Sequence, residues 1–154
     1  MRRDLELEGF DSVLGECRSL LGNGYQRAGN WSLGQICRHI RLTIEANMNG
    51  YPWWMTLLGF PLRPILKLLL LPRIMSGRSP AGLQTAPSLV PPDGLDDDQE
   101  FQAFESCVGS FVRHTGPLYP HPAFGKMSHE EFGKFHVAHC IHHLRFLIPK
   151  SDEG

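Results

Sequence analysis

The sequence predicts an all-α protein, a four-helix bundle with an extra short helix and a long loop between its second and third main helices. Apolar residues recur every three or four positions in four long segments, the spacing that gives a helix one apolar face. Two of these segments open with a capping box, and no segment of comparable length alternates apolar and polar residues. At 154 residues, we expect residues 1–154 to form a single domain with one core.

The first two helices follow from these patterns. The first is expected over residues 7–21 and is ended by a glycine-rich turn. The second begins with two signals at once: Ser32 and Gln35 form a capping box, and Trp31 and Ile36 form the hydrophobic staple around it. Both helices are predicted to pack an apolar face into the core.

The middle of the chain is rich in leucine and aromatic residues from Trp53 to Pro72, but two prolines and two basic residues interrupt this run. A membrane-spanning helix needs about 20 predominantly apolar residues without central charges. We therefore expect a buried or interface-forming hairpin that holds a short helix from Arg63 or Pro64 to Leu71. Residues 72–96 are rich in Gly, Pro and Ser and are predicted to form a long irregular connection.

The last two main helices also have clear starts. Asp96 to Asp98 place negative charge at the positive end of the third helix dipole, and this helix is expected to end near His114. Ser128 and Glu131 form the capping box of the fourth helix, which ends before Pro149.

Four of the eight histidines crowd into the middle of the fourth helix. On a helix, His136, His139 and His143 share the apolar face, whereas His142 points elsewhere and is expected to be solvated. His139 and His143 are four residues apart, so their rings stack closely enough to share one ion. His39, on the flank of the second helix's apolar face, is the leading candidate for a third ligand. The alternative is that these histidines bind only backbone, water or acidic groups.

Two segments carry a resemblance to a known family. NWSLGQICRHI and HPAFGKMSHEEFGKFHVAHCIHHLRFL resemble the DinB-like (DinB/YfiT) superfamily of metal-binding four-helix bundles, and within it an uncharacterised bacterial branch. The resemblance implies that His39, His139 and His143 hold a divalent metal. It makes His136 a neighbour that supports the site, carries a proton or adds a ligand, and we name it as the candidate catalytic residue.

Two residues depart from the pattern of that branch. Phe132 stands where Trp is usual, and Phe146 stands where Gln is usual. The second change removes a hydrogen-bonding group close to the predicted site, and it bears on catalysis more than on metal binding.

Neutral imidazoles suit transition metals, so zinc or nickel is expected first, with iron or copper as further candidates. The resemblance implies a metal-dependent enzyme that activates water or a thiol of a small-molecule substrate, as a hydrolase or a thiol-dependent transferase. The alternative is a non-catalytic, metal-stabilised binding or stress-associated module whose leucine-rich segment is the working surface. Homodimers are common in the superfamily, so a homodimer is expected.

Composition limits the remaining classes of function. The formal charge is −1, so no basic footprint for nucleic acid exists. The four cysteines are scattered, which indicates small buried side chains in a reducing cytoplasm rather than a disulfide framework. The sequence begins without a signal-peptide pattern, and neither a membrane nor a nucleic acid is predicted as a partner.

Overall fold

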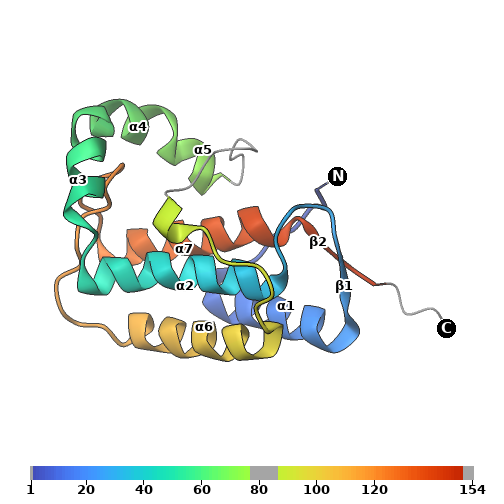
Figure 1. The fold of residues 1–154 in the computed structure, drawn as a ribbon. Coiled ribbons are helices and arrows are strands. Elements are labelled where there is room, and N and C mark those ends of the chain that lie inside the picture. The colour runs from blue at the N-terminus through green and yellow to red at the C-terminus, as the bar shows by residue number, and fades with distance from the viewer. Residues whose placement is uncertain (1, 77–86, 151–154) are drawn as a thin grey trace.

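Four long helices form the body of the protein, which we describe from a computed structural model over residues 2–76 and 87–150 (Figure 1). They are α1 (Gly9–Asn23), α2 (Leu33–Asn49), α6 (Asp97–Val112) and α7 (His129–Leu144). Helix α2 packs against both α6 and α7, and α1 packs against the same two helices. The mostly helical, all-α character that the sequence predicts is confirmed.

One hydrophobic core joins the four long helices. Its fully buried members come from each of them, for example Val13 of α1, Leu33 of α2, Phe104 of α6 and Phe132 of α7. The four cysteines are buried and free, as predicted. Burial of such side chains is the main force that holds the helices together.

The predicted helix starts are confirmed in detail. The hydroxyl groups of Ser32 and Ser128 each accept a hydrogen bond from the backbone N–H three residues later. In turn, the side-chain oxygens of Gln35 and Glu131 accept a hydrogen bond from the backbone N–H of the capping serine. Asp96 caps α6 by accepting from the N–H of Gln99 at 2.8 Å. These local bonds satisfy N–H groups that a helix leaves without partners.

The sequence prediction missed a small antiparallel sheet. Strand β1 (Tyr25–Arg27) pairs with β2 (Leu147–Pro149), with Tyr25 opposite Pro149 and Arg27 opposite Leu147. Each strand has three residues, which is too short for an alternating pattern to stand out. The sheet joins the segment before α2 to the end of α7.

The middle of the chain is more helical and more exposed than predicted. It forms α3 (Trp53–Gly59), the 3-10 turn η1 (Phe60–Leu62), α4 (Arg63–Leu69) and α5 (Leu71–Met75). Prolines stand in the first turns of η1, α4 and α5, where they break the run into short pieces. We call residues 53–75 the helical arm. It has no buried residue, so of the two predicted forms of the hairpin the buried one is wrong, and the interface-forming one stays a prediction.

The helical arm arches over α7, on the opposite side of the molecule from α6, and α5 packs on α7 (Figure 1). Among the described residues, no helix is both long enough and apolar enough to cross a membrane. Part of the predicted irregular connection, residues 77–86, lies outside the described residues. The connection resumes as the 3-10 turn η2 (Pro87–Leu89), which packs on α2.

Candidate metal centre

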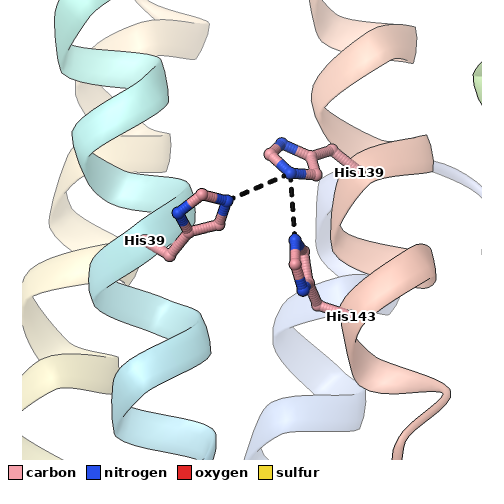
Figure 2. A group of neighbouring side chains, drawn as sticks. All are labelled: His39, His139 and His143. Carbon is pink, nitrogen blue, oxygen red and sulfur yellow. Dashed lines mark hydrogen bonds between the residues drawn. The ribbon is translucent and has the colours of Figure 1, made fainter. Parts of the chain in front are cut away.

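Three histidines from two helices point toward one another (Figure 2). His39 comes from α2, and His139 and His143 come from successive turns of α7. The capping boxes at Ser32 and Ser128 fix where each helix begins and so fix which side chains face the other helix. These are the three residues that the sequence and the resemblance selected.

The spacing of the ring nitrogens fits a shared metal ion. Nε2 of His139 lies 3.2 Å from Nε2 of His39 and 3.0 Å from Nε2 of His143, and one ligand atom of each residue lies within 4.8 Å of the others. Two nitrogens bound to one ion at about 2.0–2.1 Å are roughly 2.9–3.4 Å apart for bond angles of about 90–110°. Both Nε2 distances lie within this range.

A backbone carbonyl sets the tautomer of His39. Its Nδ1–H donates to the carbonyl oxygen of Leu89, in η2, at 2.8 Å. Because a neutral imidazole carries only one proton, Nε2 of His39 presents a lone pair to the other two rings. A hydrogen bond from the far ring nitrogen is the usual way in which proteins orient a metal-binding histidine.

Protein groups alone do not satisfy this arrangement. With the His39 proton on Nδ1, a proton on Nε2 of either His139 or His143 serves only one of the two close N···N contacts. The other contact is then left without a hydrogen bond, and with the proton on His143 it sets the lone pairs of His39 and His139 against each other. A cation at the meeting point of the three nitrogens would give each of them a favourable bond.

The three imidazoles are held in their neutral form. Burial lowers the pKa of His39, against a smaller opposing effect of its bond to Leu89. Burial, followed by the neighbouring histidines, lowers the pKa of His139 and of His143 well below the usual value. Metal binding requires neutral imidazoles, so the site needs no deprotonation step near pH 7.

Trp31 forms one wall of the site. Its ring centroid lies 4.9 Å from that of His39 and 5.1 Å from that of His143, and the latter pair is stacked. These contacts restrict the rotation of both imidazoles. From the sequence, Trp31 was predicted only as part of the hydrophobic staple at the start of α2. Its position directly before that helix was the signal that it could also contact His39.

One side of the site is accessible. His39 is 2% exposed, whereas His139 and His143 are only partly buried. A cavity of about 240 Å³ lies between α2, η2 and the start of the helical arm; Leu42, Tyr51, Met55 and Leu89 are among its lining residues, and the three histidines are not. Leu89 thus contributes its carbonyl to His39 and also lines the cavity.

His136 is bonded to α2 rather than to the three histidines. It is fully buried, and its Nε2–H donates to Oδ1 of Asn47 at 2.6 Å. Burial lowers its pKa to about 3, with a smaller contribution from His121. In the described part of the chain, no hydrogen bond joins it to the three histidines, although it is close enough to His139 to contribute to the lowered pKa of that residue.

Other predicted neighbours also have defined places. His142 is not fully solvated but half-buried, with its ring 5.0 Å from that of His143 and 6.0 Å from that of Phe146. Phe146 packs against Gly29, where an added Cβ would lie 3.1 Å from the Phe146 side chain. Glu45 pairs with Arg41 at 2.9 Å and lines the cavity.

Comparison with known proteins places this chain in a family without assigning an activity. A family model described as a protein of unknown function, DUF1569, matches residues 1–150. Neither curated proteins nor solved structures gave a match. The match covers both helices that carry the three histidines, the sheet and the helical arm, and the chain therefore belongs to the DUF1569 family.

Proposed function

We propose that the protein is a metal-dependent enzyme of the DinB/YfiT-like four-helix-bundle type, in which His39, His139 and His143 hold one divalent metal. The convergence of three neutral Nε2 atoms, with His39 fixed by the Leu89 carbonyl, supports this proposal most directly. The packing of α1, α2, α6 and α7 around one core supports the bundle.

The ligand set indicates the kind of metal. Three imidazoles without a carboxylate favour zinc or nickel, with iron as a further candidate, over magnesium or calcium. A metal bound there would act as a Lewis acid that lowers the pKa of a water or thiol and makes it reactive near neutral pH. This chemistry suits a hydrolase or a thiol-dependent transferase.

The chain's own residues prepare the site for that chemistry. Leu89 and Trp31 hold His39 and His143 in orientation, so little ordering is left for the binding step. The partial exposure of His139 and His143 leaves an approach for a small molecule. The neighbouring cavity would receive the part of that molecule that does not react, and its leucine and methionine side chains favour an apolar part.

The first test is metal content. The purified protein should carry about one equivalent of zinc or nickel by elemental analysis, and the double variant His139→Ala/His143→Ala should carry none. His142→Ala is the matched control, because it lies on the same helix and beside His143 but outside the converging group. A wild-type protein that takes up no metal, or a double variant that retains it, contradicts the proposal.

The second test separates an enzyme from a module that the metal only stabilises. Cobalt-loaded protein should develop a thiolate-to-cobalt absorption band when cysteine is added, because an open coordination position accepts the sulfur. A spectrum that cysteine leaves unchanged indicates that protein groups close the site. The metal is then structural and the non-catalytic alternative holds.

A further inference from the structure

The outer side of the helical arm is an exposed apolar surface. Eight of its large apolar side chains are more than half exposed: Trp53 76%, Leu57 64%, Leu58 67%, Phe60 65%, Leu62 52%, Ile65 57%, Leu68 75% and Leu69 57%. So many exposed large apolar side chains within one segment of a folded domain indicate an interaction site.

The charges within the arm and the sequence that flanks it have one sign. Between residues 46 and 92 the sequence has none of the chain's 16 acidic residues and four of its 15 basic ones. Three of these four, Arg63, Lys67 and Arg73, lie on the helical arm itself. The rest of the chain is therefore acidic, and the arm is a basic and apolar segment within an acidic protein.

The arm is attached firmly to the body of the protein. Arg63 donates from Nε to the carbonyl oxygen of Pro122 at 2.8 Å, and a Cβ added at Gly59 would lie 2.4 Å from the same oxygen. Half-buried side chains such as Leu66 and Ile74 face inward, and α5 packs on α7. The exposed apolar residues are thus presented on a fixed support.

We propose that the helical arm binds the surface of anionic phospholipid bilayers. The exposed apolar side chains of the arm, including Trp53 and Phe60, would enter the headgroup and upper acyl region of the bilayer. Lys67 and Arg73 would contact anionic headgroups. Helices α3 and α4 have seven residues each, or roughly 10 Å of helix, which suits lying in the interface rather than crossing the bilayer.

Charge favours a bilayer over a second copy of the chain. A symmetric dimer places the same surface against itself, and here that would bring Arg63, Lys67 and Arg73 of both copies together without a carboxylate in either arm. An anionic bilayer supplies the missing negative charge. The sequence predicted no membrane partner because prolines and basic residues interrupt the apolar run. An arm that lies in the bilayer surface tolerates both, since it needs no spanning helix.

Vesicle flotation of the full-length protein tests this proposal. Vesicles of phosphatidylcholine and phosphatidylglycerol should carry the protein upward, whereas pure phosphatidylcholine vesicles should carry much less. Raising the salt concentration should weaken the binding, because salt screens the contribution of the basic residues. Absence of binding to the anionic vesicles, or equal binding to both kinds, overturns the proposal.

Paired variants connect the binding to the arm. Leu58→Ser/Leu68→Ser should reduce the vesicle partition coefficient at least tenfold, whereas Val112→Ser, at an apolar residue of α6 that is 58% exposed, should leave it unchanged. Arg73→Glu should reduce it by roughly fivefold or more, and the exposed Lys126 provides the control variant Lys126→Glu.

Sedimentation of the same proteins without lipid tests whether a second copy of the chain, rather than a bilayer, covers the arm. A concentration-dependent dimer that Leu58→Ser/Leu68→Ser abolishes, together with no vesicle binding, would show that the arm is a dimer interface and would overturn the membrane proposal. A wild-type protein that binds anionic vesicles while the double variant does not would support it.

Discussion

Helices α2 and α7 use apolar residues in the opposite way from the helical arm. In α2 and α7 the apolar side chains are inside. Among them, Nε2 of His136 bonds to Asn47 and the three Nε2 atoms of the site converge, although Nδ1 of His136 and of His139 is buried without a hydrogen bond to any described residue. In the arm, leucine and aromatic side chains face outward and no residue is buried. The same residue types therefore stabilise the fold in one region and form a surface in the other.

This contrast separates two kinds of evidence for function. The candidate metal centre is identified by a few polar atoms at defined distances, so a change of one atom should abolish it. The arm is identified by area and net charge, so single changes should weaken it by degrees. Stability measurements can test whether the two regions differ as sharply as their burial indicates.

The largest difference is expected from matched leucine truncations. Leu33→Ala, at a side chain that is 0% exposed, should lower the free energy of unfolding by about 2–5 kcal/mol, because it removes apolar contacts and leaves a cavity. Leu68→Ala, at a side chain that is 75% exposed, should change it by no more than about 0.5 kcal/mol. Urea unfolding measures both, and a comparable loss for Leu68→Ala would mean that the arm is part of the core.

The stability gained from metal binding should depend on the long helices and not on the arm. At a free metal concentration 100-fold above the dissociation constant, binding adds about 2.7 kcal/mol to the stability of the folded state. Adding a chelator should therefore lower the melting temperature of the wild-type protein and of Leu58→Ser/Leu68→Ser equally. Chelation should have no effect on His139→Ala, and an unchanged wild-type melting temperature would contradict a tight site.

The pH dependence of stability should follow the buried histidines. His136 has a folded pKa of about 3, whereas in the unfolded chain it takes up a proton near pH 6.5. Its contribution to stability is therefore complete above pH 6.5 and is lost as the pH falls toward 3, at about 1.4 kcal/mol for each pH unit. Urea midpoints between pH 7 and 5, measured with chelator, should fall less steeply in His136→Gln.

Leu68→Ala is the control for that measurement, since the arm has no buried titrating group to match His136. Its midpoints should fall with pH as steeply as those of the wild-type protein. If His136→Gln kept the full slope, proton uptake at His136 would not be the source of the effect.

The sequence predicted the parts of this structure that depend on nearby residues. Helix starts depend on side chains three residues apart, such as Ser128 and Glu131, and helix faces depend on spacing. Both are local, and the long helices are correspondingly close to their predicted ranges. The pairing of His139 with His143 follows from the same spacing. His39 was predicted from its place on the flank of the apolar face of one further helix, α2.

What the sequence could not predict depends on distant partners. The carbonyl of Leu89 reaches His39 across 50 positions, and any residue type offers a carbonyl. Asn47 meets His136 across 89 positions, which gives that histidine a partner outside the site. For a similar reason the sequence left open whether the arm is buried or forms an interface, because an apolar run has the same pattern whether it is covered or exposed.

The smallest expected effect concerns the helix caps, which the long helices α2, α6 and α7 have and the arm lacks. Ser128 caps α7 through its hydroxyl, whereas α3, α4 and α5 begin without a side-chain cap. Ser128→Ala should lower the free energy of unfolding by about 1 kcal/mol. Ser110→Ala is the control, because that exposed hydroxyl bonds within α6 and its loss should cost less than about 0.5 kcal/mol. Equal effects in urea unfolding would mean that packing, rather than the cap, fixes where the histidine-bearing helix begins.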